Sequence, residues 1–114
     1  WLFYIGRSYN DRWLIDRQLN GNVCEARIWD VARTQQEIWK NMYDIEDPEN
    51  EAHLAAYWKF NEGSGNDIKD YSKYHNDAHI VRYWKDFNSK EEYDVKNEEL
   101  WPSGIEVPQV NRED

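Results

Sequence analysis

The chain has 114 residues, enough for one domain, and its apolar share of 39% is low for a core that stabilises itself. Its 14 Lys and Arg against 23 Asp and Glu leave a formal charge of −9, which argues against nucleic acid or an anionic membrane surface as partner. Disordered acidic chains are poor in aromatic residues, whereas the aromatic share here is 16%, so we expect a folded chain.

Charge and end composition add three expectations. Residues 43–114 carry almost all the excess acid, which indicates acidic loops that hold a cation or keep the surface soluble. No run of apolar residues approaches the ~20 of a membrane-spanning helix, so no transmembrane segment is expected. The chain opens inside an apolar run at Trp1, as a fragment of a longer protein would, and the single Cys24 excludes an internal disulfide.

The first part of the chain predicts short strands separated by turns. Residues 2–8 are a strand candidate, and residues 12–17 are a return strand or a loop. Asn20-Gly21 is a strong turn signal, because both residues tolerate positive φ. Residues 23–30 give the clearest strand, whose inner face is expected to hold Cys24, Ala26 and Ile28.

A short helix and a second clear strand follow. Thr34-Gln35-Gln36-Glu37 is a capping box, so a helix is expected over residues 34–42. Residues 53–61 predict the next strand. One of its faces is expected to hold Leu54, Ala56, Trp58 and Phe60.

The remaining residues are polar and rich in turns. Residues 68–76 predict turns and residues 78–84 a strand, whereas the charged residues 85–99 predict a loop or an insertion. Residues 100–107 could pair at a sheet edge, since Pro102 bars them from a central position. Several short strands, turn signals and one short helix together indicate a mainly β sandwich.

Three segments in this order resemble the closing half of laminin-G-like domains. The first holds Ile5-Gly6-Arg7, residues 21–30 (GNVCEARIWD) and the helix cap at residues 34–38. The second is residues 54–65, LAAYWKFNEGSG, which resembles the family's L-V-A-Y-W-x-F-x-E-G-S-G. The third is Lys69-Asp70-Tyr71-Ser72 with Asn76-Asp77, where Ala78 stands in place of the family's glycine. The resemblance covers about residues 4–84.

The resemblance implies an all-β fold, a concanavalin A-like jelly-roll sandwich of two antiparallel sheets. Because such domains are longer than this chain, residues 1–84 would be the C-terminal part of a laminin-G-like domain, a partial domain with one short helix. Residues 85–114 would add its charged loop and C-terminal edge segment. Exposed strand edges are sticky, so a neighbouring domain or chain, or a preceding segment, should complete the sandwich. Many bacterial members are modules of secreted or lipid-anchored proteins that handle glycans, which implies an extracellular or cell-surface location, for example as an outer-membrane lipoprotein.

Catalytic residues are not expected in this chain. Glucanases of the same superfamily carry E-x-D-x-x-E on a strand, which places nucleophile and acid at the ~5 Å spacing of retaining hydrolysis. Residues 92–97 approximate this motif, but Asn97 stands where the second Glu would be, in a segment without strand character. The three histidines, His53, His75 and His79, show neither metal-protease nor triad spacing.

Calcium is the one metal that the sequence suggests. Hard cations take several side-chain oxygens together with backbone carbonyls. Asp and Asn in turns also bond to their own backbone, which is the structural alternative. The candidate calcium ligands crowd one turn-rich loop and are Asp67, Asp70, Asn76 and Asp77.

Sugar binding needs exposed aromatic rings that stack on pyranose faces. Trp29 and Trp58 fall within the matched strands and are expected in the core. Trp13 is the best candidate for an exposed ring, because it flanks the variable hairpin after Ile5-Gly6-Arg7. The candidate ligand-binding residues are Trp13, Tyr9, Tyr83 and Trp84.

The sequence thus predicts a non-catalytic binding or architectural module that recognises carbohydrate. Two alternatives stay open: an accessory part of a glycoside hydrolase whose catalytic residues lie elsewhere, and an interdomain packing module without a ligand. Glu25, Arg27 and Trp29 form a row on one strand face, and we expect a structural role for it. Arg27 should pair with Glu25 or Glu37 and lay its stem against Trp29.

Overall fold

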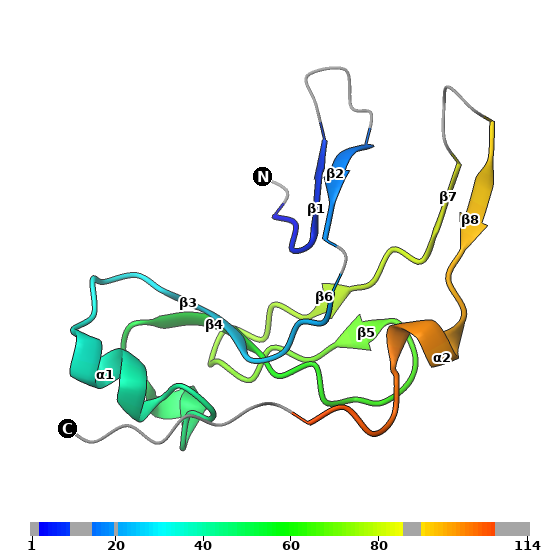
Figure 1. Ribbon diagram of the computed structural model, residues 1–114. Coiled ribbons are helices and arrows are strands. Elements are labelled where there is room, and N and C mark those ends of the chain that lie inside the picture. The colour runs from blue at the N-terminus through cyan, green and yellow to red at the C-terminus, as the bar shows by residue number, and fades with distance from the viewer. Residues whose placement is uncertain (1–2, 10–14, 20, 86–89, 107–114) are drawn as a thin grey trace. The chain divides into compact units, whose positions relative to one another are not determined.

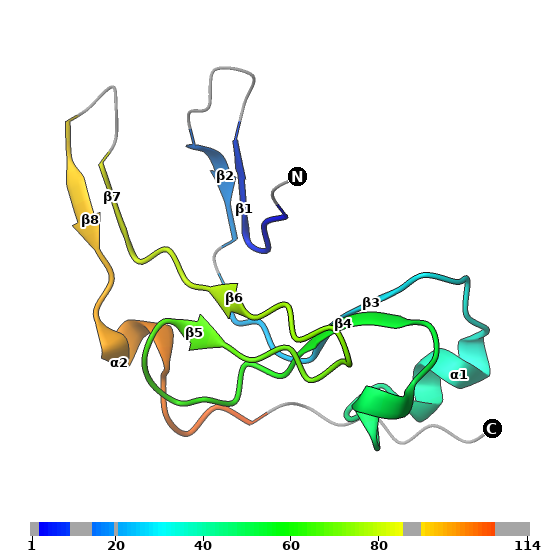
Figure 2. The same ribbon diagram turned by 180° about the vertical axis from the view of Figure 1, so that it is seen from behind.

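The computed structural model describes residues 3–9, 15–19, 21–85 and 90–106. Within these residues the strands are short and pair two by two, always antiparallel (Figures 1 and 2). In chain order the strands are β1 (Arg7–Tyr9), β2 (Ile15–Gln18), β3 (Ala26–Trp29), β4 (Leu54–Trp58), β5 (Asp67–Ile68), β6 (Ala78–His79), β7 (Tyr83–Lys85) and β8 (Glu92–Asp94). The helices are α1 (Gln35–Lys40), the 3-10 turn η1 (Pro48–Asn50) and α2 (Asn97–Leu100).

The chain divides into two compact units, each built from segments that are separated in the sequence. The first unit comprises residues 1–22 and 81–95, and it holds the pairs β1–β2 and β7–β8. The second unit comprises residues 23–80 and 96–114, and it holds the pairs β3–β4 and β5–β6 together with the helices. Segments distant in the sequence therefore share one unit.

The described apolar core lies in the second unit, on both faces of β4. One cluster contains Ile45, Leu54 and Tyr57, and the other contains Ala56, Trp58 and Ile68. The two clusters exist because nearly every residue of β4 is buried, as expected for a strand covered on both sides. β4 is thus the strand around which the second unit packs.

The predicted face of β4 is wrong at Leu54. This residue was expected beside Ala56, but it packs with Tyr57 in the other cluster. Successive residues of β3 pair with Ala56 and then with Leu54, so Ala55 is an extra residue in the ladder, a β-bulge. One extra residue shifts the two-residue alternation by one, which moves Leu54 to the opposite face.

The capping box is confirmed at the start of α1. The amide of Glu37 donates to Oγ1 of Thr34 over 3.2 Å, and the amide of Thr34 donates to the Glu37 carboxylate over 3.0 Å. The helix ends at Lys40, two residues before the predicted end. Capping determined where the helix starts, as the sequence indicated.

Residues 78–99 differ most from the prediction. The single strand expected over residues 78–84 is divided between β6 and β7. The region expected to be a loop or an insertion contains β8 and begins α2, so the described chain has a second short α-helix rather than one. Residues 100–106 form no strand in the described part, contrary to the expected edge segment. The charged residues of β8 do not indicate a strand by themselves. The strand is recognisable only from its pairing with β7.

These two-stranded sheets are compatible with a part of a β sandwich, but they do not decide the arrangement of its strands. The jelly roll therefore stays a prediction. No helix in the described ranges has both the length and the apolar character needed to cross a membrane, as the sequence predicted.

Candidate functional site

Three of the four predicted ligand-binding residues, Tyr9, Tyr83 and Trp84, belong to strands of the first unit. Tyr9 ends β1, and Tyr83 and Trp84 begin β7, whereas Trp13 lies outside the described residues. The side chain of Tyr83 is 54% exposed, which suits a ring that meets a ligand. The two hairpins that carry these residues lie at opposite ends of the sequence, and folding assigns both to one compact unit.

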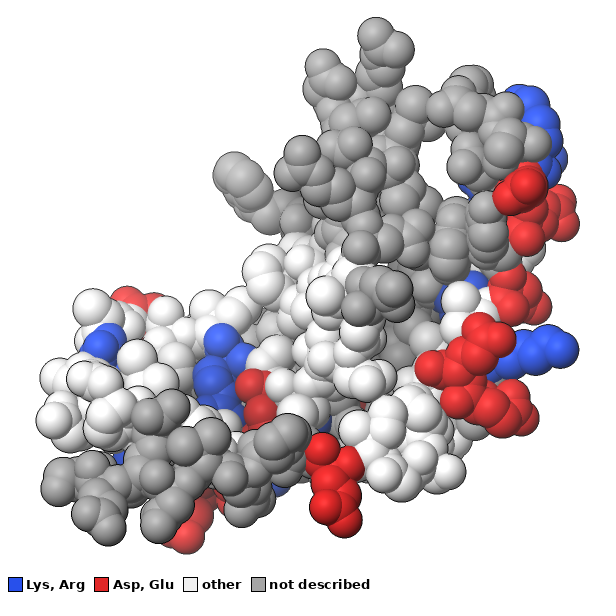
Figure 3. All heavy atoms as spheres, viewed as in Figure 1, with Lys and Arg blue, Asp and Glu red and all other residues white. Residues whose placement is uncertain are grey.

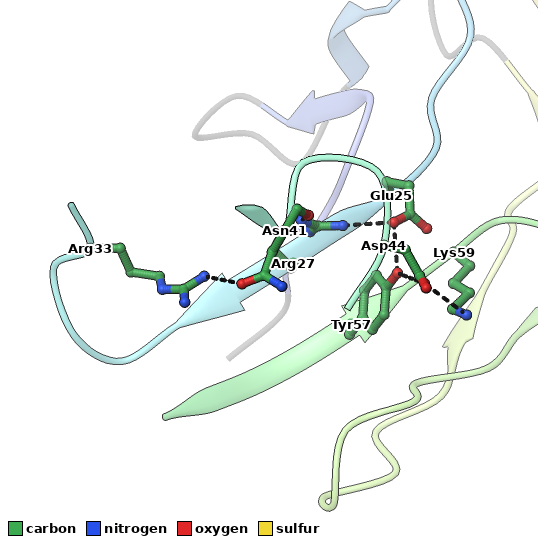
Figure 4. A network of polar contacts seen from close by, with 7 residues as sticks. All are labelled: Glu25, Arg27, Arg33, Asn41, Asp44, Tyr57 and Lys59. Carbon is green, nitrogen blue, oxygen red and sulfur yellow. Dashed lines mark hydrogen bonds and ion pairs between the residues drawn. The ribbon is translucent and has the colours of Figure 1, made fainter. Parts of the chain in front are cut away.

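A polar network occupies the second unit around Arg27 (Figure 4). The register of β3 and β4 places Arg27 directly opposite Tyr57, and the guanidinium lies 5.0 Å from the centre of the tyrosine ring. Nη2 of Arg27 contacts Oε1 of Glu25 over 2.7 Å, and Nη1 donates to the carbonyl of Asn41. These partners hold a guanidinium that is only 15% exposed, and such a charge is stable only when paired.

The predicted pair of Arg27 with Glu25 is confirmed. A different arginine stacks on the tryptophan of this row: the guanidinium of Arg33 lies 3.6 Å from the centre of the Trp29 ring. Glu37, the other partner considered for Arg27, contacts Arg33 over 3.7 Å. The cross-strand register explains the difference, because it directs the Arg27 guanidinium to Tyr57.

The hydroxyl of Tyr57 joins two carboxylates (Figure 4). It lies 2.6 Å from Oε1 of Glu25 and 3.2 Å from Oδ1 of Asp44. Burial, then the hydrogen bond to Glu25 and its negative charge, raise the pKa of Tyr57 far above its usual range. The phenol therefore keeps its proton near neutral pH and serves as a hydrogen-bond donor.

Asp44 stays ionised in the same network. Burial raises the pKa of its carboxyl, but the hydrogen bond and positive charge of Lys59 and the hydroxyl of Tyr57 outweigh burial, and the pKa is lowered overall. Nζ of Lys59 lies 3.3 Å from Oδ1 of Asp44. The network thus consists of fixed charges held by mutual contacts, which is the chemistry of a structural or binding surface.

Asp70, one of the candidate calcium ligands, is fully buried. Its Oδ1 accepts the amides of Tyr57 and Ser72, each over 2.9 Å. Its Oδ2 accepts the amide of Asn76 over 2.9 Å and the hydroxyl of Ser72 over 3.0 Å. The carboxylate therefore links β4 to the loop that follows β5 through hydrogen bonds, and each of its two oxygens accepts hydrogen bonds from protein groups.

The other calcium candidates do not converge with Asp70 in the same way. Asp77 accepts the amide of Asp70 over 2.9 Å, and Asp67 is an exposed partner of His79. The backbone carbonyl of Asn76 accepts the indole N–H of the nearby tryptophan of β4. Across the described residues, no three His, Cys, Asp or Glu side chains form a group that could hold a metal ion. The contacts fit the structural alternative, and calcium binding stays a prediction.

The remaining titratable candidates are exposed. Each histidine lies near a carboxylate, in the pairs His53–Asp30, His75–Glu49 and His79–Asp67. The segment that resembles a glucanase motif has strand character in its first half, since residues 92–94 form β8, but its last residue, Asn97, begins α2. Acidic side chains gather around α2 on the face in Figure 3. Glu92 and Asp94 lie two residues apart on β8, but the last position of the motif holds Asn97, an amide at the start of α2, in place of a carboxylate.

Sequence reasoning missed the groups that surround the buried tyrosine of β4. Lys59 directly follows β4 and lies two residues after Tyr57, and the expected alternation of residues 53–61, which puts both on one side, was a usable signal. Tyr71 joins them from another segment: its ring centre lies 6.2 Å from that of Tyr57. Only the register between strands reveals that contact.

Comparison of the chain with protein-family models, with curated proteins and with solved structures finds no match. The resemblance to laminin-G-like domains therefore stays a prediction. The functional argument rests on the geometry of the described residues.

Proposed function

We propose that the chain is a non-catalytic binding module of a secreted or cell-surface protein, and that it recognises carbohydrate through aromatic side chains of its first unit. The observation that carries the proposal is that Tyr9, Tyr83 and Trp84 belong to strands of one compact unit, with Tyr83 more than half exposed. Rings of this kind bury large apolar area at low entropic cost and stack on pyranose faces.

The proposed architecture is a part of a laminin-G-like sandwich that a neighbouring chain, domain or preceding segment completes. The pairing of strands in twos supports this, because a two-stranded sheet is marginal alone and gains stability from further strands. Free strand edges attract such partners. The net charge of −9 argues against nucleic acid as the partner.

The test compares ring removal with removal of a structural charge. Trp13→Ala and Tyr83→Ala should each lower the affinity for a glycan identified on an array about tenfold, since each removes a stacking ring. Their melting temperatures should change little. Arg27→Ala is the matched control: it should lower the melting temperature and leave affinity within about twofold, because Arg27 is held by internal partners.

Three results would overturn parts of the proposal. Affinity lost at Arg27 with an unchanged melting temperature would show that the roles are reversed. Silence on a glycan array, together with a large interdomain interface, would favour a packing module without a ligand. Hydrolysis that is abolished by substitution of a carboxylate within this chain would show that the module is catalytic.

A further inference from the structure

We propose that Lys59 and Lys69, together with the ring of Tyr71, form a second binding site, which takes a single carboxylate or sulfate group of an acidic saccharide. This site lies on the second unit, apart from the aromatic residues of the first. Its saccharide specificity rests on the proposed function, whereas its preference for an anion follows from the local charges alone.

An antiparallel bridge brings together the segments that carry the two lysines. This isolated bridge joins Trp58 and Asp70. Antiparallel neighbours run in opposite directions, so Lys59 and Lys69 both follow on the same side of the bridge. The amide of Tyr71 donates to a carbonyl of β4 over 2.8 Å, which confirms the register on the other side of the bridge.

Both ammonium groups contact the same aromatic ring. Nζ of Lys59 lies 4.9 Å from the centre of the Tyr71 ring, and Nζ of Lys69 lies 4.6 Å from it. Lys59 also approaches the ring of Tyr57, at 5.6 Å. The negative faces of aromatic rings attract cations, so the ring of Tyr71 attracts both ammonium groups.

Like charges directly opposite each other on paired strands are destabilising. Lys59 is neutralised by Asp44, but no ion pair joins Lys69 to a carboxylate within the described residues. The backbone amide of Lys69 donates to Oε2 of Glu62 over 2.8 Å. An anion that contacts both ammonium groups would offset their mutual repulsion.

The surroundings select the kind of anion. Ionic interactions at a surface are screened beyond about 8 Å at physiological salt, so the lysine pair acts locally within a chain of net charge −9. A densely charged polymer would meet repulsion from the acidic remainder, whereas one anionic group on an otherwise neutral saccharide would not. The partly exposed ring of Tyr71 then offers an apolar surface to the sugar beside that group.

The experiment uses pairs of oligosaccharides that differ in one group: a glucuronate-terminated probe against its carboxyl-reduced counterpart, and a singly sulfated probe against its unsulfated counterpart. Calorimetric titration of the whole chain should show the anionic member of at least one pair binding about tenfold more tightly. Lys59→Gln and Lys69→Gln should each reduce this preference at least about fivefold and leave the neutral member unaffected.

Lys73→Gln is the matched control, because Lys73 also lies over a tyrosine ring, that of Tyr74 at 5.3 Å, and within the described residues no second lysine lies over that ring. It should leave every affinity within about twofold. The melting temperature of Lys69→Gln should equal or exceed that of the unaltered chain, since the change removes a like-charge contact. A folding defect is thereby separated from a binding defect.

The outcomes distinguish this site from the proposed function. Equal binding of anionic and neutral probes, unchanged by the lysine variants, would overturn the anion site and leave carbohydrate recognition intact. Anion-dependent binding that needs Lys59 and Lys69 but not Trp13 or Tyr83 would support the site and refute the aromatic one. Absence of binding to every probe would overturn both.

Discussion

The carboxylate of Asp70 accepts four hydrogen bonds from β4 and from the loop after β5. Asp70→Asn replaces one acceptor oxygen by an NH₂ group that faces amide donors, so buried donors lose their partner. We expect a loss of about 2–4 kcal/mol in the free energy of unfolding, measured by urea denaturation. Asp67→Asn is the control, because Asp67 is exposed, and it should cost under about 0.5 kcal/mol. Equal losses for the two variants would contradict a structural role of Asp70.

Tyr57 predicts a loss of stability at alkaline pH. Its folded pKa is raised, so the folded state keeps the phenolic proton at a pH where the unfolded chain, with a pKa of about 10, releases it. The stabilisation is complete below pH about 10 and falls above it, by up to about 1.4 kcal/mol per pH unit. Denaturation measured at pH 9, 10 and 11 checks this. Tyr57→Phe should show a shallower decline, and an unchanged slope would refute the assignment.

At the scale of the secondary-structure elements, α1 depends on its cap. Thr34→Ala removes the hydroxyl that accepts the amide of Glu37 and should cost about 1 kcal/mol of stability. Gln36→Ala, in the same turn, is the control and should change little, because it leaves the cap intact. Amide exchange at Glu37 measures the effect, and similar exchange in both variants would exclude a contribution from the cap.

The same cap gives α1 a pH dependence. The hydrogen bond from the Thr34 backbone lowers the pKa of Glu37, with further contributions from the Thr34 side chain and the charge of Arg33 that exceed the opposing effect of burial. A lowered folded pKa means that the contribution is present above the usual glutamate pKa and is lost as pH falls through the folded value. Helix-specific amide protection should therefore decline on acidification, and Glu37→Gln should reduce that decline.

Local patterns predicted elements better than they predicted contacts. The capping box located α1, and alternation located β3 and β4, because these signals lie within a few residues. Glu25 has a left-handed φ of 52°, which explains why β3 starts only at Ala26. The pair of Arg27 with Glu25 could likewise be read from spacing. The contact of Arg27 with Tyr57 could not, because it depends on register between strands far apart in the chain, and the bulge at Ala55 changes that register.

At the scale of the whole molecule, the two units should differ in local stability. The pairs β1–β2 and β7–β8 are two-stranded, and such a pair is marginally stable alone, whereas β4 is buried in the described core of the second unit. Hydrogen exchange followed by mass spectrometry should show amides of these hairpins exchanging on the order of a hundredfold faster than those of β4. Equal protection in both units would show that the first unit has a core of its own.

The alternation of the two units along the chain has a consequence for synthesis on the ribosome. Residues 1–22 are synthesised before residues 81–95, the other segment of their unit, which follow only after residues 23–80 of the second unit. Joining segments so far apart carries a loop-closure cost that favours local pairs first. The β3–β4 pair can therefore form before residues 81–95 are available to the β1–β2 hairpin. A nascent chain would form β4 early and complete its proposed sugar-binding unit late. Synonymous codon changes that slow translation between residues 23 and 80 would therefore prolong the time for which the β1–β2 hairpin is exposed.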